Sequence, residues 1–320
     1  MFSTVIIHVK IAVLVKTAMT SPTLRTKRIK KKIMNNFYNS NDNKAKALMI
    51  LSALSFSIMA AIVKATPHSV ELKALARQIV SCIFVLIIIL YHKKRIIPLK
   101  KNIIKLILRC VFGTIGIYYY FYSIDNLLLA NASMLTRLSP FFVTLFAFII
   151  LKESIRGITW MIFIPMLIGC GLIIKPNSDL FNPASLFAII SACSGALAYV
   201  MIKSIGKNES SYTIIFWFTL ISSLCYAPIA FEEIKTLNGF YHSNLIFIGI
   251  FGVLGQIGLT KAYQLAKASH VAPFGYLYIV FTGIIGFYFS NEIPDFLSFT
   301  GYQIIMISYY FLMRFQDKEA

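Results

Sequence analysis

Long apolar segments, separated by short polar ones, recur along almost the whole chain. An apolar stretch of about 18–20 residues is long enough to cross the hydrocarbon core of a bilayer as a helix. Ten segments meet this description, and each is predicted to be a membrane-spanning helix. Their approximate bounds are 45–66, 74–91, 104–123, 127–151, 157–174, 184–203, 212–231, 244–263, 270–290 and 296–313. The pattern therefore predicts an all-α integral membrane protein of ten transmembrane helices joined by short loops.

Composition supports a membrane environment. Of the 320 residues, 58% are hydrophobic and 13% are charged, whereas a soluble domain has about 45–50% and about 25%. A chain this apolar must bury its surface, which excludes intrinsic disorder. The five cysteines lie within apolar runs and lack metal-ligand spacing, so we expect no disulfide framework, no metal site and no cofactor.

Positive charge is distributed unevenly over the predicted loops. The chain has 31 Lys and Arg residues against 12 Asp and Glu. If the first span runs outward, 22 of these basic residues lie in inside segments and 5 in outside segments. By the positive-inside rule both termini are then cytoplasmic. Because the basic residues are dispersed over alternate loops, nucleic acid is not an expected partner.

The N-terminal 1–44 form a basic arm ahead of the first span. Residues 5–19 are apolar but are interrupted by Lys10 and Lys16, and residues 25–32 are a basic cluster. A targeting presequence and a surface-lying amphipathic segment are both compatible with this arm. Met34 as the true start of the protein is a further alternative.

The two halves of the chain correspond without a gap when 45–175 is aligned with 184–314. The matched positions include Ala45/Ala184, Ile50/Ile189, Ser52/Ser191, Ala53/Ala192, Ser55/Ser194, Lys64/Lys203, Gly113/Gly252, Gly116/Gly255, Phe148/Phe287 and Glu153/Glu292. Each repeat holds five predicted spans, an odd number, so the second repeat enters the membrane with inverted orientation. Inverted repeats are typical of secondary transporters, which bind substrate between the halves.

Two segments carry a resemblance to a known family. NASMLTRLSPFFVTLFAFIILKE (131–153) and HVAPFGYLYIVFTGIIGFYFSNEIPD (270–295), each followed by a Gly-containing span, resemble the fourth spans of the two EamA repeats in the drug/metabolite transporter superfamily. The resemblance covers nearly all of 45–314, and it implies ten helices and a carrier of small metabolites. The second segment is also similar to the S-adenosylmethionine uptake carriers of that superfamily, which makes S-adenosylmethionine a candidate substrate.

Arg137 lies well inside the fourth predicted span, and its repeat equivalent is Tyr276. A cation at this depth is costly unless it faces a cavity or a partner. One interpretation is a guanidinium clamp for a substrate carboxylate or phosphate. The alternative is a structural pair with a helix carbonyl or with Asp125.

Other residues are candidates by position. Tyr199, Tyr276 and Trp217 lie deep in their spans and could present aromatic faces to a base, sulfonium or ammonium group. With an arginine, this arrangement suits a zwitterionic substrate. Asn131 and His270 are equivalent helix-entry residues, predicted to cap a helix or line the pocket.

Two further pairs are related by the repeat. Lys64 and Lys203 end the first span of each half, where they either snorkel to the interface or line a gate at each mouth of the pathway. Pro140 and Pro273 lie in the two fourth spans and are predicted hinges.

The acidic residues all lie in loops or at the ends of predicted spans. Proton-coupled carriers commonly use a carboxylate within the membrane as a relay, so we expect exchange or facilitated movement. The chain has no HExxH, GxSxG or paired buried Asp, so an enzyme is not expected. A non-transporting scaffold or assembly factor and a lipid flippase stay open as alternatives.

The expected partners are a small-molecule metabolite and the lipid bilayer, in a multi-pass protein of the bacterial inner membrane. The substrate, the direction of transport, and the choice between monomer and homodimer are left open by the sequence.

Overall fold

The computed structural model describes residues 24–316, apart from 137, 154–156, 176–181, 207–208, 236–241, 272–273, 276 and 291–294. Within these residues all regular structure is helical. The helices are α2 (Leu24–Ala65), α3 (Val70–Tyr91), η1 (Lys100–Asn102), α4 (Ile103–Asn126), α5 (Leu129–Thr136), α6 (Ser139–Leu151), α7 (Gly157–Ile174), α8 (Ala184–Ile205), α9 (Ser211–Lys235), α10 (His242–Leu265), α11 (Ala268–Val271), α12 (Leu277–Ser290) and α13 (Phe296–Gln316). The internal contacts divide the chain after Lys44 into two units, and the contacts and the cavity described below lie in the second.

Seven helical segments of the described chain are long and apolar enough to cross a membrane. They are Asn41–Ala65, Val70–Tyr91, Lys100–Asn126, Leu129–Leu151, Ala184–Ile205, Ser211–Lys235 and Ser243–Leu265. Shorter apolar helices cover Trp160–Ile174, Leu277–Phe289 and Phe296–Ser308. These segments fall on the spans predicted from the sequence, and the prediction of an all-helical membrane protein is confirmed.

Local sequence explains where helix α3 begins and ends. The Ser69 hydroxyl accepts a hydrogen bond from the Leu72 amide at 3.2 Å. Glu71 lies in the first turn, where a negative charge favours the helix dipole. The helix ends at Tyr91, after which Lys93 adopts a positive φ of 49°. The first turn and the end of this span are therefore set by capping and by a change in backbone conformation.

The fourth span of the first repeat is interrupted. Over the predicted span 127–151 the structure describes two helices, α5 and α6; Leu138 between them is a turn residue, and Arg137 lies outside the described residues. Pro140 lies in the first turn of α6, where its missing N–H leaves no intrahelical bond unmade. The predicted hinge residue therefore lies directly after the break.

The fourth span of the second repeat is interrupted as well. Over the predicted span 270–290 the structure describes α11, which includes Val271, and α12, which begins at Leu277. Phe274 and Gly275 have a 3₁₀ conformation between them, and Pro273 lies outside the described residues. Helix α12 packs against α5, and α11 packs against α6, so the two interrupted spans contact each other.

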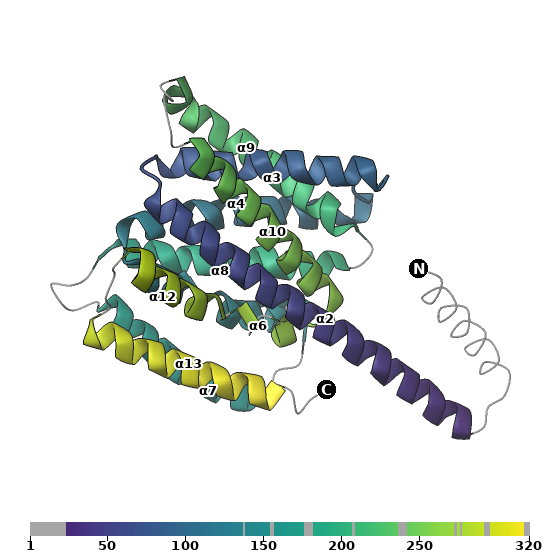
Figure 1. Cartoon of the computed structure of the whole chain (residues 1–320). Coiled ribbons are helices and arrows are strands. Elements are labelled where there is room, and N and C mark those ends of the chain that lie inside the picture. The colour runs from purple at the N-terminus through teal and green to yellow at the C-terminus, as the bar shows by residue number, and fades with distance from the viewer. Residues whose placement is uncertain are drawn as a thin grey trace. The chain divides into compact units, whose positions relative to one another are not determined.

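Two glycines permit a close approach of helices α7 and α13. Helices α7 and α13 lie side by side, as the teal and yellow ribbons of Figure 1 show. A Cβ atom added to Gly169 would lie 2.8 Å from the Gly301 carbonyl oxygen, and one added to Gly301 would lie 2.6 Å from the Gly169 carbonyl oxygen. Larger side chains at this crossing would push the two helices apart.

Two hydrogen bonds join the repeats in an equivalent way. The Ser52 hydroxyl on α2 donates to the Gly255 carbonyl on α10, and the Ser191 hydroxyl on α8 donates to the Gly116 carbonyl on α4, both at 2.7 Å. The two donors occupy matched positions in the repeat alignment, and so do the two acceptors. In both cases the first helix of one repeat contacts the third helix of the other.

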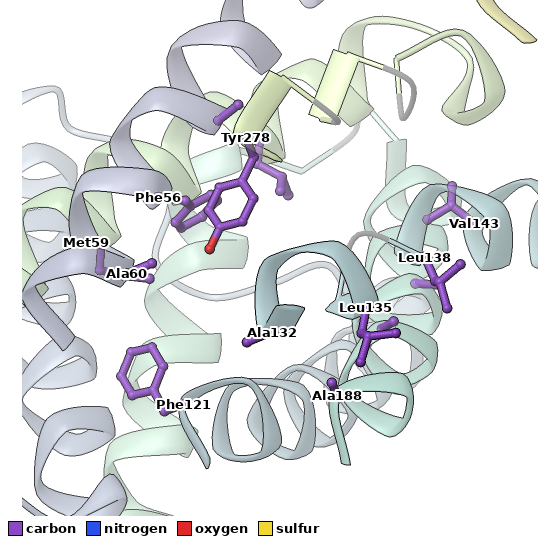
Figure 2. Close-up of a cluster of buried hydrophobic side chains, with 14 of the residues drawn as sticks. Phe56, Met59, Ala60, Phe121, Ala132, Leu135, Leu138, Val143, Ala188 and Tyr278 are labelled. Carbon is purple, nitrogen blue, oxygen red and sulfur yellow. The ribbon is translucent and has the colours of Figure 1, made fainter. Parts of the chain in front are cut away.

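The buried apolar cluster is built from both repeats. Figure 2 shows Phe56, Met59 and Ala60 on α2, Ala132 and Leu135 on α5, Leu138 and Val143 beside and on α6, Ala188 on α8, Phe121 on α4 and Tyr278 on α12. Side chains from the interrupted helices α5 and α12 therefore belong to the same core as the long helices. This core holds the interrupted spans against the rest of the bundle.

Candidate functional site

A cavity with about 650 Å³ of empty space lies between helices of the two repeats. Helices α2, α3 and α4 form one part of its wall, and α8, α9 and α10 form the other. Thr136 and Ser139, on either side of the break between α5 and α6, also line it. The cavity wall therefore combines helices from both halves of the chain with residues next to the junction of α5 and α6.

Two buried arginines dominate the chemistry of this cavity. Arg77, about two turns into α3, is 3% exposed, and Arg109, nearly two turns into α4, is 2% exposed. Both side chains line the cavity. A cation at the centre of a span costs about 2.5–3.5 kcal/mol on insertion scales. Two such residues in one cavity therefore indicate a function that offsets this cost.

The Arg77 guanidinium contacts neutral side-chain amides. Its Nη1 donates to the Gln78 Oε1 atom at 2.6 Å, and its Nη2 donates to the Gln256 Oε1 atom at 3.5 Å. The Arg77 Nε atom and the Gln78 Nε2 atom are buried without a hydrogen-bond partner among the described residues. The positive charge of Arg77 is therefore solvated by amide dipoles and is not neutralised by a carboxylate of the described chain.

Arg109 is held by an aromatic ring. Its guanidinium carbon lies 3.9 Å from the centroid of the Phe218 ring on α9, which is a cation–π contact. The Arg109 Nε atom is also buried without a partner in the described part of the chain. No carboxylate of the described residues pairs with Arg109, so a second uncompensated positive charge faces the cavity.

Glycines make room for both guanidinium groups. A Cβ atom on Gly113 would lie 2.0 Å from the Arg109 Nη1 atom, and one on Gly252 would lie 2.9 Å from the Arg77 Cγ atom. These two glycines are equivalent in the repeat. Gly252 on α10 therefore leaves space for Arg77 on the facing helix α3. Gly113 leaves space for Arg109 on the same helix, α4.

Aromatic residues complete the wall. Phe56, Phe218, Tyr120 and Tyr199 line the cavity. Tyr199 stacks on Tyr263 with ring centroids 5.1 Å apart. The Tyr120 hydroxyl lies 2.6 Å from the Tyr278 hydroxyl on α12, which connects the cavity wall to an interrupted helix.

The structure separates the predicted binding residues. Tyr199 lines the cavity, but Arg137, Tyr276 and the hinge candidate Pro273 lie outside the described residues. Trp217 is not among the described lining residues, and its Nε1 donates to the Ile96 carbonyl at 2.9 Å.

The helix-entry candidates Asn131 and His270 are placed away from the described cavity wall. The Asn131 Oδ1 atom accepts a hydrogen bond from the Tyr302 hydroxyl at 2.6 Å. His270 is buried, 8% exposed. Neither is among the residues that line the cavity.

Lys64 and Lys203, the gate candidates, bond to main-chain oxygens. The Lys64 ammonium donates to the carbonyls of Ile124 and Leu127, at 3.0 and 2.6 Å. The Lys203 ammonium donates to the carbonyl of Ala266. These carbonyl groups lie near the end of a third span, so each lysine fixes the turn that leads into an interrupted helix.

Sequence reasoning missed the two arginines of the cavity. Arg77 lay at the start of the predicted span 74–91 and was assigned no role, whereas the structure shows it as a buried residue of α3. Arg109 lay inside the predicted span 104–123 and was assigned no role. The available signal was a cation inside each of two otherwise apolar spans, and the same cost argument that singled out Arg137 applies to both.

Comparisons with known proteins agree with this architecture. The model of the EamA-like transporter family matches residues 43–175 and 182–314. The chain is 32% identical to the pseudopaline exporter CntI of Pseudomonas aeruginosa strain UCBPP-PA14, over 83% of this chain and 95% of that protein. It is 26% identical to an S-adenosylmethionine uptake transporter of Rickettsia felis, over 85% and 92%. It is also 30% identical to human solute carrier family 35 member G1, over 81% and 76%.

A solved crystal structure has the same fold. It aligns with a TM-score of 0.61 over 84% of this chain and 96% of its own, at 14% sequence identity. The apolar helices and these relatives establish a multi-pass integral membrane protein. The resemblance seen in the sequence is confirmed: the chain belongs to the EamA-like transporter family.

Proposed function

We propose that the protein is a secondary transporter for a small polar or zwitterionic metabolite that carries at least one anionic group. The observation that carries the proposal is the pair of buried guanidinium groups, Arg77 and Arg109, in a cavity lined by both repeats. Arginine binds carboxylate and phosphate groups with two parallel hydrogen bonds. The relatives named as transporters or exporters support the same class of function.

The proposed architecture is ten helices in two inverted five-helix repeats, 45–175 and 184–314, with both termini in the cytoplasm. The ten apolar helical segments and the equivalent Ser52 and Ser191 contacts support it. The bacterial relatives support a location in the bacterial inner membrane. Inverted repeats allow the two halves to rock around one central site, so that access alternates between the two sides.

The interrupted fourth spans are the proposed moving elements. Freed backbone groups inside a membrane are tolerated where they are buried in protein or line a cavity. The break at Leu138 lies between Thr136 and Ser139, which both line the cavity. A substrate bound there would contact the break directly, which would couple binding to movement of α5 and α6.

The proposed mode of transport is exchange or facilitated movement. No acidic residue of the described chain lines the cavity, so the described part of the chain offers no carboxylate there to relay a proton. An empty cavity also keeps two uncompensated positive charges in a poorly polarisable environment. Return of the empty carrier is therefore unfavourable, and counterflow of one anion against another is favoured.

The test is counterflow in liposomes that contain the purified protein. The labelled probes are succinate, citrate, glutamate, lysine and S-adenosylmethionine, the last being the candidate that the Rickettsia relatives suggest. We expect saturable uptake of at least one carboxylate-bearing probe into preloaded vesicles, much slower uptake into empty vesicles, and little effect of a protonophore. Uptake that a protonophore abolishes would contradict exchange.

The same experiment separates the other classes of function. A scaffold or assembly factor would give no counterflow with any probe, and its cellular function would survive Arg77→Gln. A lipid flippase would instead expose a labelled phospholipid to a membrane-impermeant quencher from the opposite leaflet.

A further inference from the structure

We propose that the substrate carries two anionic groups, one bound at Arg77 and the other at Arg109. This inference rests on the proposed transport function and specifies the class of substrate for the same cavity. A dicarboxylate, or a carboxylate together with a phosphate, has the required chemistry.

The first argument for two anionic groups is the charge of the cavity. Arg77 and Arg109 are 3% and 2% exposed, and neither forms an ion pair with an acidic residue of the described chain. Unpaired buried charges are strongly unfavourable, and a bound counter-charge removes the penalty. One anionic group compensates one guanidinium only, whereas two anionic groups leave the loaded cavity neutral.

The second argument is that several buried polar atoms next to the arginines lack a hydrogen-bond partner among the described residues. Three buried atoms at the arginines lack a hydrogen-bond partner among the described residues: Arg77 Nε, Gln78 Nε2 and Arg109 Nε. All three are N–H donors. Buried donors are normally paired, so these positions favour a partner that supplies acceptors, as a carboxylate or phosphate does.

The third argument is that different residues hold the two arginine side chains. Arg77 is held from α10 by the Gln256 amide, and Arg109 is held from α9 by the Phe218 ring. Each arginine side chain also passes close to a glycine, Arg77 to Gly252 and Arg109 to Gly113, where a larger residue would displace it. The two guanidinium groups are therefore fixed at different places, and each offers its own anchoring point.

This assignment ranks the candidate substrates. S-Adenosylmethionine has one carboxylate, one ammonium and one sulfonium group, so its net charge is positive at neutral pH. Bound in the cavity, it would leave one guanidinium uncompensated and would add cationic groups next to it. The aromatic residues Tyr199 and Phe56 could stabilise a sulfonium, but a dianion compensates both arginines. We expect the dianion to bind more tightly.

The experiment is a charge series measured by isothermal titration calorimetry on the purified full-length protein at neutral pH. The probes are succinate and adipate, each with its monoamide and its diamide, together with S-adenosylmethionine. Within the succinate series and within the adipate series the carbon chain stays the same, while the number of negative charges falls from two to one to none. We expect each dicarboxylate to bind at least about tenfold more tightly than its monoamide, with no measurable binding of the diamides.

Variants of the two arginines identify which group each guanidinium holds. Arg77→Gln and Arg109→Gln should each weaken dicarboxylate binding by about tenfold to a hundredfold. Each should change monoamide binding much less, because the remaining guanidinium still holds one carboxylate. Arg95→Gln is the matched control, since Arg95 is exposed and outside the cavity, and it should bind as the unmodified protein does. Elution as one sharp peak in size-exclusion chromatography establishes that each variant is folded.

Two results would overturn the inference. One is binding of a monoamide, a diamide or S-adenosylmethionine as tight as that of the dicarboxylates. The other is an equal loss of dicarboxylate and monoamide binding in a single-arginine variant. Failure of the proposed transport function looks different, because it would be the absence of counterflow for every probe.

Discussion

Lys64 and Lys203, which occupy matched positions in the two repeats, donate hydrogen bonds to the carbonyls of Leu127 and Ala266, which are matched in the same alignment. The ammonium of Lys64 additionally reaches the Ile124 carbonyl. Carbonyl groups at the end of a helix lack an intrahelical partner, and a cation there is favourable. The two lysines therefore stabilise the same turn in each repeat, at the point where the third span leads into the interrupted fourth.

The first prediction concerns Lys64→Met, which keeps the apolar stem and removes the ammonium. Hydrogen bonds to charged groups contribute about 1.5–3 kcal/mol. We expect the free energy of unfolding to fall by about 1–3 kcal/mol and the apparent melting temperature in detergent to fall with it. Lys203→Met should act in the same direction, because Lys203 makes the equivalent contact.

Lys94→Met is the control for this prediction, because Lys94 is exposed in the loop after α3. Its stability should change by less than about 0.5 kcal/mol. The alternative role of the two lysines as gates makes a different prediction. A gate variant would keep its melting temperature and change only the rate of counterflow.

The positions of the helices could be predicted because span length and apolarity are local properties of the sequence. The predicted segment 157–174 coincides with α7, and the predicted segment 184–203 begins where α8 begins and ends just before it. The interruptions at Leu138 and between Val271 and Leu277 could not be placed in this way. The predicted hinges Pro140 and Pro273 lie next to these places, and Thr136 and Ser139 flank the first one, but mean apolarity over a window of span length does not show a break of a few residues.

The residues of the candidate site could be predicted from the sequence less well than the positions of the helices. Of the two aromatic candidates, Tyr199 lines the cavity, whereas the Trp217 Nε1 atom donates a hydrogen bond to the Ile96 carbonyl. Depth along a span gives no information on which side of a helix faces a cavity in the bundle. Arg77 was missed for a related reason, since it lies near the end of a predicted span and only the packing of α3 shows that it is buried.

The second prediction tests the space around Arg109. In Gly113→Ala the new methyl group would lie 2.0 Å from the Arg109 Nη1 atom and 2.6 Å from the Phe218 Cε2 atom, so the guanidinium has to move. We expect dicarboxylate affinity, measured by calorimetry, to fall at least about tenfold. Gly171→Ala is the matched control in another helix, because a Cβ there meets nothing within 4 Å. That variant should bind normally and gain up to about 1 kcal/mol from helix propensity.

The third prediction tests the equivalence of the two repeats. Ser52→Ala and Ser191→Ala each remove a buried hydroxyl that donates to a glycine carbonyl of the other repeat. Each variant should lose about 1 kcal/mol of unfolding free energy, and the two losses should agree within about 0.5 kcal/mol. A loss in one variant with no change in the other would contradict a symmetric arrangement. Thermal unfolding of both purified variants in the same detergent provides the measurement.

The fourth prediction is that Arg109 lowers the stability of the empty protein but is required for ligand binding. In Arg109→Met an apolar chain replaces a buried cation that no described carboxylate compensates. Relief of the buried charge is worth about 2.5–3.5 kcal/mol, and loss of the contact with the Phe218 ring costs about 0.5–2 kcal/mol. The empty variant should therefore be more stable than the unmodified protein by about 0.5–3 kcal/mol, the difference of these two effects.

Added succinate or adipate should raise the melting temperature of the unmodified protein and leave that of Arg109→Met almost unchanged, because ligand binding stabilises only a protein that binds the ligand. Arg95→Met, at an exposed position, should match the unmodified protein in both measurements. A lower melting temperature for empty Arg109→Met would mean that Arg109 stabilises the folded bundle. In that case its burial would no longer indicate a binding role, and the anion site would have to rest on Arg77.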